Sequence, residues 1–401
     1  MKVYCRPEAS HPKDEISFDK RSASLSPSGD PIVFELTIGK QQILTPLLTV
    51  AGAVDKKQSL PILSNILLQL TDQQFSLTAT DLEIQITALV PGASFAQSAA
   101  VTVPAKKMID IIRSLEDEAM PTLSFSGNTL FIKTEQSQFK LATLPAADYP
   151  IAENEVSEFE FSLQASALMR LLQATYFAMA QQDVRVYLNG LFLEIDSKSI
   201  AAVTADGHRM AICRLTDDTL NQLHRLLIPK KGVQEMLRLL ATVPTDESVH
   251  LSASKNHISL TTSQFKFSSK LIEARFPPYA KAIPKDHEKI VIIDRDLLKR
   301  ALSRIVILAN EKLRAVVLRI EPNSLTLLAS NKEQEEGIET LVAETQGGSL
   351  TIGLNATYLS DVLNYFNEGP LRLAFGDADS SILVQAVSDE HYQYIIMPMK
   401  L

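Results

Sequence analysis

The residues that come closest to a catalytic arrangement are an aspartate and a histidine near the middle of the chain. Asp206 and His208 lie two positions apart, and Ser199 and Thr204 precede them on the same stretch. These residue types could supply the orienting acid, the base and the nucleophile of an acyl-transfer enzyme. An aspartate and a histidine two positions apart on a turn do not by themselves place the acid against the base as catalysis requires. No His-x-x-x-His pair, glycine-rich phosphate loop or paired cysteines support an active site, so we expect no catalysis, no cofactor and no metal.

The segment that holds Asp206 is the middle copy of a pattern that recurs through the chain. A similar run ends at Asp81, 125 residues upstream, and another ends at Asn331, 125 residues downstream. Before all three positions apolar residues alternate with others, as in half-buried strands. The outer copies continue as Asp-Leu-Glu and Asn-Lys-Glu, without histidine. The strand and turn therefore belong to the scaffold, and residues 207–210 are what the middle copy adds.

The period is long enough for each copy to hold its own core, so we expect three domains. Each copy contains two amphipathic helix patterns and several alternating strand patterns, which predicts an α+β fold with helices on antiparallel sheets. Proline-rich stretches at 144–150 and 275–280 indicate the exits from the first two copies. The predicted domains are 32–154, 155–286 and 287–401, after a disordered N-terminal extension at 1–31 that mixes charges with Ser and Pro.

Charge is divided unevenly between the predicted helices and the rest of the chain. The whole chain carries −8, which alone argues against nucleic acid as a partner. The helix windows 40–54, 105–115, 164–182, 230–241, 295–312 and 355–367 together carry +8, so the remainder carries −16. If the helices share one surface, that surface attracts phosphate while the rest repels it. The alternative is that Lys and Arg are enriched there only as good helix formers.

Helix placement gives a set of cations that could face a duplex. These candidate lining residues are Lys40, Lys106, Arg113, Arg170, Lys230, Lys231, Arg238, Lys299, Arg300 and Arg304. No apolar run approaches the roughly 18 residues of a membrane helix, and the N-terminus lacks the apolar core of a signal peptide, so we expect a cytoplasmic protein with no membrane partner. Cys5 and Cys213 do not have metal-ligand spacing, and we expect Cys213 to be a buried structural residue.

Several short motifs together resemble one family. They are Thr-Leu-Pro-Ala-Ala-Asp at 143–148, Gln-Asp-Val-Arg at 182–185, Tyr-Leu-Asn-Gly at 187–190, Asp-Gly-His-Arg-Met at 206–210, Asn-Glu-Lys at 310–312, Glu-Gln-Glu-Glu at 333–336 and the terminal Met-Pro-Met-Lys-Leu. Over about residues 33–401 the chain is similar to the bacterial replicative sliding clamps, the beta subunits of DNA polymerase III. The resemblance implies three DNA-clamp domains per chain and a head-to-tail homodimeric ring with helices around its hole. It also implies a non-catalytic processivity factor that slides on double-stranded DNA without sequence specificity.

The resemblance further implies that the clamp tethers the replicative polymerase catalytic subunit, a clamp loader and other clamp-binding-motif proteins. Each inserts a short peptide between domains 2 and 3, and the corresponding positions are Leu188, Gly207, His208, Arg209, Met210, Pro277, Asn355, Tyr358, Ser381, Met397, Pro398, Met399 and Leu401. Ala205, Lys281, Ala282 and Lys400 depart from the family pattern, and we expect them to change peptide affinity rather than location, since lysine lacks the planar fork of arginine. Lys57, Gln182, Arg185 and Tyr187 are implied DNA contacts at the ring face.

The implied dimer seam joins domain 1 of one subunit to domain 3 of the other. Phe139 and Leu141 alternate around Lys140 on a predicted edge strand, and such an edge needs covering. Their expected counterparts are Ile307 and Leu308. The expected charge pairs place Lys107 or Lys133 opposite Glu333, Glu335, Glu336 or Glu339. Two alternatives stay open: Phe139 is an ordinary core residue, or the protein is an adaptor that never encircles DNA.

Overall fold

The computed structural model describes residues 32–55, 60–71, 74–92, 98–152, 156–217, 223–285 and 287–400. The predicted N-terminal extension, Lys57 and Leu401 lie outside these ranges. Within them the order strand, helix, four strands, helix, three strands recurs in three units, with one additional short strand at the end of the first, β9 (Leu144–Pro145), and one before the second helix of the third, β22 (Glu344–Gln346). The prediction of three similar α+β units, with helices on antiparallel sheets, is therefore confirmed.

The helices and strands of the three units have the following bounds. The first unit contains β1 (Ile32–Thr37), α1 (Lys40–Val50), β2 (Asn65–Leu70), β3 (Phe75–Thr80), β4 (Ile84–Val90), β5 (Ala99–Pro104), α2 (Ala105–Ser114), β6 (Thr122–Ser126), β7 (Thr129–Lys133), β8 (Gln138–Ala142) and the short β9 (Leu144–Pro145). The second contains β10 (Phe159–Gln164), α3 (Ala165–Thr175), β11 (Gly190–Asp196), β12 (Ser199–Ala205), β13 (Arg209–Thr216), β14 (His224–Pro229), α4 (Lys230–Leu240), β15 (Ser248–Ala253), β16 (His257–Thr261) and β17 (Phe265–Lys270). The third contains β18 (Lys289–Asp294), α5 (Arg295–Ile305), β19 (Ala315–Glu321), β20 (Ser324–Ser330), β21 (Glu336–Val342), β22 (Glu344–Gln346), β23 (Leu350–Asn355), α6 (Ala356–Tyr365), β24 (Pro370–Phe375), β25 (Ile382–Ala386) and β26 (Asp389–Ile396).

The sheets run across the boundaries between units. The last strand of the second unit, β17, pairs antiparallel with β4 of the first, and Phe267 faces Ile86 in that register. The last strand of the third unit, β26, pairs in the same way with β13 of the second. Two nine-stranded sheets result, and a four-stranded sheet completes each end of the chain, in the orders β1-β6-β7-β8 and β21-β20-β19-β23. The three units are thus joined by continuous hydrogen-bonded sheet.

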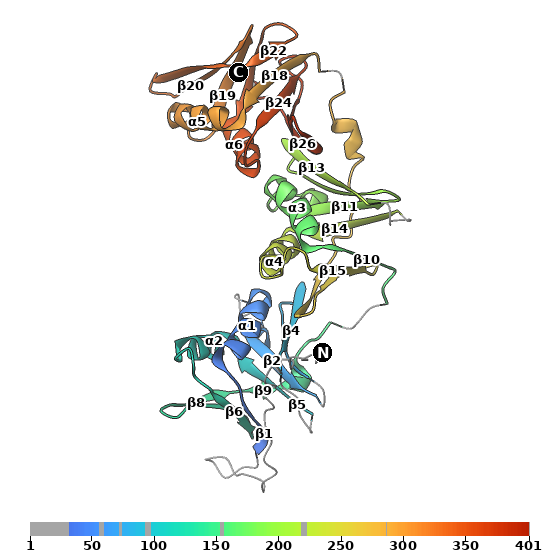
Figure 1. Ribbon diagram of the computed structural model, residues 1–401, viewed down its shortest axis with the longest axis vertical. Helices are drawn as coiled ribbons and strands as arrows, with labels where there is room; N and C mark the ends of the chain where they lie inside the picture. Colours follow the sequence, from blue (N-terminus) through green and yellow to red (C-terminus); the bar gives the residue numbers. More distant parts are fainter. Residues whose placement is uncertain are drawn as a thin grey trace, which may run out of the picture.

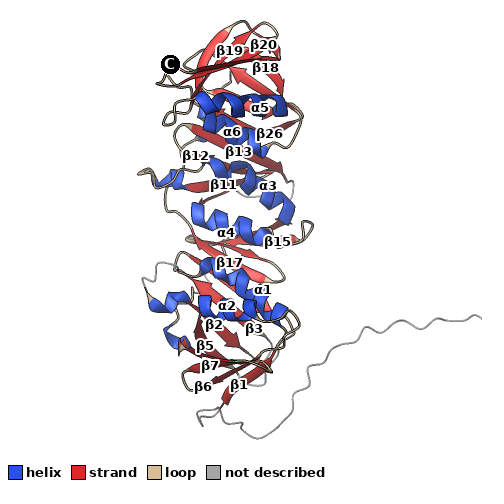
Figure 2. Cartoon of the chain, turned by 90° about the vertical axis from the view of Figure 1, so that its left-hand side faces the viewer, coloured by secondary structure: helices blue, strands red, loops and turns tan. Residues whose placement is uncertain are grey.

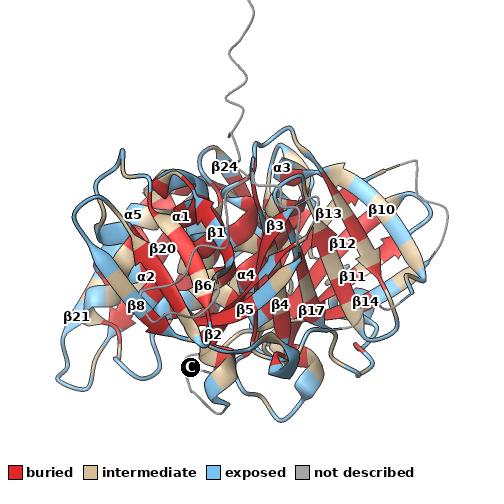
Figure 3. Cartoon of the chain, turned by 90° about the horizontal axis from the view of Figure 1, so that it is seen from below, coloured by how far each residue is buried: buried red, intermediate tan, exposed pale blue. Residues whose placement is uncertain are grey.

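The units follow one another along an arc, with the helices on its inner side and the sheets outside (Figure 1). Seen from that inner side, the six helices form one column (Figure 2). Each helix buries an apolar stripe against the sheets: in α5 the buried residues Leu298, Ala301, Leu302 and Ile305 recur at helical spacing. Burial is concentrated where helices meet sheets, while the loops are exposed (Figure 3).

The first helix of each unit ends earlier than the sequence pattern predicts. Windows 40–54, 164–182 and 295–312 become α1, α3 and α5, each followed by a single 3-10 turn at Ala51–Ala53, Tyr176–Ala178 and Val306–Leu308. In all three the N–H after the turn bonds the carbonyl of its first residue, at 3.1 to 3.4 Å. Such a turn continues the apolar stripe with tighter winding, so periodicity does not reveal where the α-helix ends. No described helix is both long and apolar enough to cross a membrane.

Candidate functional site

The segment around Asp206 forms a tight turn between β12 and β13. The Asp206 carboxylate accepts the N–H groups of His208 at 2.9 Å and Arg209 at 3.0 Å, which closes the turn. Gly207 adopts a φ of 92°, a left-handed value that favours glycine. A Cβ at Gly207 would also lie 2.6 Å from a guanidinium nitrogen of Arg185, which the flexible arginine side chain can relieve by moving, so the backbone conformation is what selects glycine here.

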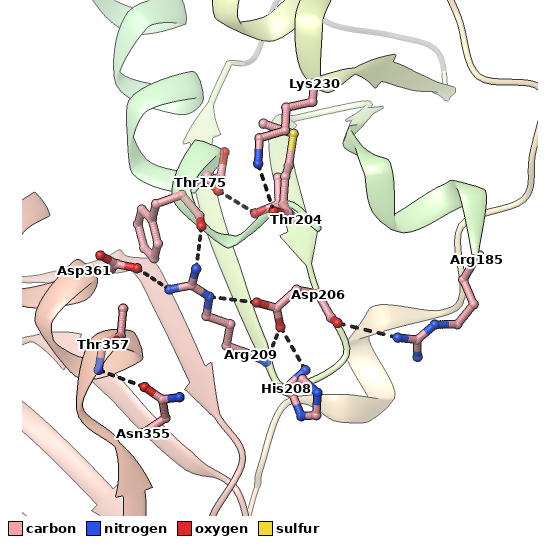
Figure 4. Close-up of polar contacts among 12 residues, drawn as sticks. Thr175, Arg185, Thr204, Asp206, His208, Arg209, Lys230, Asn355, Thr357 and Asp361 are labelled. Atoms are coloured by element: carbon pink, nitrogen blue, oxygen red, sulfur yellow. Dashed lines mark hydrogen bonds and ion pairs between the residues drawn. The ribbon is translucent and has the colours of Figure 1, made fainter. Parts of the chain in front are cut away.

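Arg209 links this turn to the third unit. Its guanidinium donates to Asp206 at 3.0 Å, to Asp361 of α6 at 2.5 Å and to the carbonyl of Phe177 at 2.7 Å (Figure 4). The arginine side chain is 11 % exposed, and the two carboxylate side chains are 16 % and 31 % exposed. The charge-assisted bond to Asp361 joins the second unit to the third, and the other two bonds hold the Arg209 side chain in place within the second unit.

Aromatic and C-terminal residues complete the same junction. The Arg209 guanidinium lies 4.5 Å from the ring centre of Tyr358, and the His208 ring stacks on that tyrosine at 6.4 Å. The N–H of Met397 donates to the His208 carbonyl at 2.8 Å. Asn355 accepts the N–H of Thr357 at 2.8 Å and so caps α6. The structure therefore brings a large part of the predicted peptide-contacting set to one junction.

Other members of that set are placed less directly. Leu188 and Met210 are buried, with 4 % and 8 % exposure, so their side chains are largely covered already. Pro277 lines a different cavity of about 640 Å³, beside Phe276 and Tyr279 on the second unit. Met399 donates its N–H to the Gly353 carbonyl at 2.8 Å, Pro398 is half-buried before it, and Ser381 directly precedes β25.

The geometry does not form an Asp–His–hydroxyl arrangement. The Thr204 hydroxyl is buried and donates to the Thr175 carbonyl, so it is committed to the structure. Ser199 starts β12 while Asp206 follows its end, roughly 20 Å away at about 3.3 Å per residue. The Asp206 carboxylate binds backbone N–H groups and Arg209, and the His208 ring stacks on Tyr358. The described residues contain no cluster of three or more metal-ligating side chains.

Several predicted lining cations join parts of the chain to each other. The prediction that Lys40 lines the hole is corrected by its burial. Its side chain is 8 % exposed, and its ammonium donates to the Leu115 carbonyl at 2.6 Å and to Asp117 at 2.8 Å, so it does not face a duplex. Helix charge alone could not reveal this, because Asp117 comes from a loop after another helix. Lys231 of α4 pairs with Asp81 and Glu83 of the first unit.

Arg238 and Arg304 are also engaged. Arg238 donates to the carbonyls of Leu48 and Thr49 at the end of α1, across the boundary between the first two units. Arg304 pairs with Glu339 of β21, a residue that we expected to face the partner subunit. Lys230 donates to the Met179 carbonyl at 3.2 Å, and Arg113 lies 3.8 Å from Asp110. The remaining candidates on the helices are Lys106, Arg170, Lys299 and Arg300, of which Lys299 is half-buried and the others are exposed.

The loop at 182–187 lies beside the turn. Arg185 pairs with Asp183 at 2.9 Å and reaches the Asp206 carbonyl at 3.5 Å. The hydrogen bond from Arg185 lowers the pKa of Asp183 to about 2, so this pair is charged at neutral pH. Gln182 has a φ of 55° and is exposed, and Tyr187 is half-buried. Burial, and then the charge of Arg209, lower the pKa of Lys230 nearby.

The predicted seam residues occupy the two ends of the chain. β8 is an edge strand, as expected, with Leu141 5 % exposed and Phe139 half-buried against the same core. β21 is the edge strand at the opposite end, and Ile307 nearby is 78 % exposed while Leu308 is half-buried. Lys107, Glu333 and Glu336 are exposed.

Sequence reasoning missed Asp361, Phe177 and Asp183, which hold the arginines in place. Asp361 carried a usable signal, because it is the one charged residue of α6 and makes that helix net negative. The carbonyl of Phe177 carried none, since a backbone acceptor has no residue type to recognise.

Comparison with known proteins agrees with this architecture. Three family models match in order: the N-terminal domain of the DNA polymerase III beta subunit over 34–153, its central domain over 162–278 and its C-terminal domain over 280–400. The chain is 41 % identical over 366 residues to the beta sliding clamp of Pseudomonas putida, covering 91 % of this chain and 99 % of that one. It is 38 % identical over 367 residues to the beta sliding clamp of Escherichia coli K12, covering 92 % and 100 %.

A crystal structure of the Pseudomonas aeruginosa sliding clamp, bound to griselimycin, superposes with a TM-score of 0.88 at 40 % identity, covering 92 % of this chain and 99 % of that one. This chain and the Pseudomonas aeruginosa clamp therefore share both sequence and fold over nearly their full lengths. The chain belongs to the beta sliding clamp family, the non-catalytic processivity subunits of DNA polymerase III.

Proposed function

We propose that two copies of this chain close head to tail into a cytoplasmic ring around double-stranded DNA. The ring slides without reading sequence, and it tethers the replicative polymerase, a clamp loader and other proteins through peptides bound between domains 2 and 3. The proposed domains are 32–154, 155–286 and 287–401. The free sheet edges support closure of the ring, and the inner helices support binding of DNA.

Unpaired sheet edges at the two ends of the chain support the proposal that two chains close into a ring. Both junctions inside the chain pair the last strand of one unit with the corresponding fourth strand of its neighbour, as in β17 with β4 and β26 with β13. In the first unit, β8 is the third strand after α2 and corresponds to β17 and β26; it lies at a sheet edge. In the third unit, β21 corresponds to β4 and β13, and it also lies at a sheet edge. A third junction of the same kind can therefore form only between chains, and head to tail. Such closure removes two exposed edges that would otherwise invite other pairings.

The inner helices carry the proposal of DNA binding. Lys106, Arg170 and Arg300 are exposed residues of α2, α3 and α5. These helices belong to the column on the inner side of the arc (Figure 2). Exposed cations on several helices attract the phosphates of a duplex, and phosphate contacts carry no sequence information. Closure of the ring, rather than the strength of any one contact, then keeps the protein on DNA.

The peptide site rests on the junction around Arg209. It offers an aromatic surface at Tyr358 and His208, and Met397 is 48 % exposed on the C-terminal segment. Methionine and aromatic side chains adapt to different apolar anchors, as a site shared by several partners requires.

A topological experiment tests the ring. The protein is loaded on nicked circular DNA with a clamp loader, salt is raised to about 1 M, where the Debye length falls to roughly 3 Å, and half of the sample is then linearised. A ring stays on the intact circle in salt and leaves the linear form. Loss from intact circles at high salt would indicate simple electrostatic binding, and no retention despite the loader would indicate an adaptor that does not encircle DNA.

A further inference from the structure

The junction between the first two units repeats the construction of the Arg209 junction. Asp81 accepts the N–H groups of Glu83 and Ile84, both at 3.0 Å, as Asp206 does those of His208 and Arg209. The residue after each aspartate has a left-handed backbone, with φ of 75° at Leu82 and 92° at Gly207. In both places the turn lies beside the strand pairing that joins two units. The fold therefore places the same kind of turn beside an inter-unit strand pairing twice.

A small cavity of about 250 Å³ lies at this first junction. Its apolar wall contains Leu82, Ile84, Pro150 and Ile151, and Lys270 stands among its lining residues. Leu82 and Ile151 are 43 % and 49 % exposed, so their side chains remain accessible. A bulky residue at positive φ is strained, and such strain persists where the surroundings hold it and often accompanies a binding role.

We propose that this cavity, at the junction of domains 1 and 2, is a second docking site for a short peptide that presents one large aliphatic side chain next to a carboxylate. The inference extends the proposed function, since it assumes that partners of this clamp carry such peptides. A partner that occupies both junctions would gain affinity through effective concentration, without any stronger individual contact.

Size and charge select this occupant. The cavity is smaller than the roughly 300–1,000 Å³ of small-molecule sites, so it suits one anchor side chain rather than a cofactor. Lys270 is exposed and supplies a cation at the site. Glu83 also lines the cavity, but its carboxylate pairs with Lys231 of α4, and so does that of Asp81, so neither acid is an unpaired anion at the site. An anionic flank on the peptide therefore complements the site better than a cationic one.

The site is also held in place before any peptide binds. Lys231 ties the turn to α4, and the N–H of Ala152 donates to the Gln85 side chain at 2.8 Å, which fixes the strap that carries Ile151. Preorganisation of this kind reduces the ordering cost of binding.

Methyl NMR on the full-length protein labelled at the isoleucine δ1 methyls tests the proposal, with N-acetyl-leucine as the probe because it combines one aliphatic anchor with a carboxylate. We expect saturable shifts at Ile84 and Ile151, a several-fold weaker response to N-acetyl-leucinamide and none to N-acetylglycine. Lys270→Gln should reduce the affinity for N-acetyl-leucine to that of the amide. Leu82→Gly should abolish the response, and it should fold because glycine accepts the φ of 75° more easily.

Equal shifts with N-acetylglycine, or unchanged binding in both Leu82→Gly and a second variant, Ile151→Ser, would overturn the proposal. Retention on nicked circular DNA, measured for the wild-type and Leu82→Gly proteins, separates this inference from the proposed function. If the wild-type protein is retained on circles but shows no chemical-shift change with N-acetyl-leucine, only the second docking site is refuted. If it shows the chemical-shift change but is not retained, only the ring is refuted.

Discussion

Arg209 offers the sharpest test of how the second and third units are held together. Replacement by alanine removes donors to Asp206, Asp361 and the Phe177 carbonyl at once, and also the cation above Tyr358. Arg185 provides a matched control, since it is a neighbouring arginine whose ion pair with Asp183 stays within one loop.

The expected magnitude follows from burial. Removing one partner of a fully buried ion pair costs about 3–5 kcal/mol, while a hydrogen bond to a charged group contributes about 1.5–3 kcal/mol. Asp206 and Asp361 keep some access to water, at 16 % and 31 % exposure, so solvent compensates part of the loss. We therefore expect Arg209→Ala to destabilise the junction by about 2–3 kcal/mol.

Urea unfolding, followed by a probe in the third unit, measures this loss. With a slope of about 2–3 kcal/mol per molar urea, the midpoint of the transition that separates the two units should fall by about 1 M. Arg185→Ala should leave the midpoint unchanged, and Arg209→Lys, which keeps the charge but not the fork, should lie between. If Arg209→Ala behaved like Arg185→Ala, the Arg209 guanidinium and its bond to Asp361 would not hold the units together, and the proposed role of Arg209 at this junction would be wrong.

Further variants test the seam, the lining and the buried thiol. Ile307→Asp, which places a charge on a residue that is 78 % exposed near β21, should give monomers at micromolar concentration in sedimentation velocity, whereas Val184→Asp, at a residue 94 % exposed elsewhere, should remain dimeric; dimer in both would count against the seam. Phe139→Ala with Leu141→Ala tests it less cleanly, because Leu141 is buried in its own core and its loss should also cost stability, by about 2–5 kcal/mol. Arg300→Gln should reduce the slope of log affinity for DNA against log salt by about 0.9 for each Arg300 that contacts a phosphate, or about 1.8 if both copies in a ring do so, and Arg304→Gln by less, since Glu339 already pairs with Arg304; equal slopes for wild type and Arg300→Gln would remove Arg300 from the lining. Burial raises the pKa of Cys213 to about 12, so in a Cys5→Ser protein no thiol should react with a disulfide reagent at pH 8 until urea unfolds the chain; rapid labelling of the folded protein would contradict this burial.

The sequence predicted the repeated elements better than the contacts between them. Alternation before Asp81, Asp206 and Asn331 identified β3, β12 and β20, because strand burial repeats every second residue whatever the tertiary context. The ends of α1, α3 and α5 were less accessible, since a 3-10 turn extends the same stripe. Sheet pairing across the units, such as β17 with β4, depends on edges that are more than 170 residues apart and leaves no local pattern.

The charged residues show the same limit. Arg300 and Arg304 lie one helical turn apart on α5, yet the second is paired with Glu339 while the first is exposed. Lys40 and Lys106 both lie in the first turn of a helix, but Lys40 is buried beside the Leu115 carbonyl while Lys106 is exposed. A charge count therefore predicted the sign of the inner face, whereas only the fold decides which cations remain available to phosphate.

The two junctions within the chain have side-chain connections as well as paired strands. At the first, Arg238 bonds the end of α1 and Lys231 pairs with Asp81. At the second, Arg209 pairs with Asp361, and Arg214 donates to Gln393 at 2.6 Å. At the free edge β21, Glu339 is already paired within its own chain, so it brings no unused charge to a partner. The exposed Lys107, Glu333 and Glu336 can still supply charge at the seam, beside paired backbone and apolar contact. The internal junctions join units of one covalent chain, whereas the seam must be made by association of two chains. We therefore expect a ring to open first at its seams, while the internal junctions keep the arc intact.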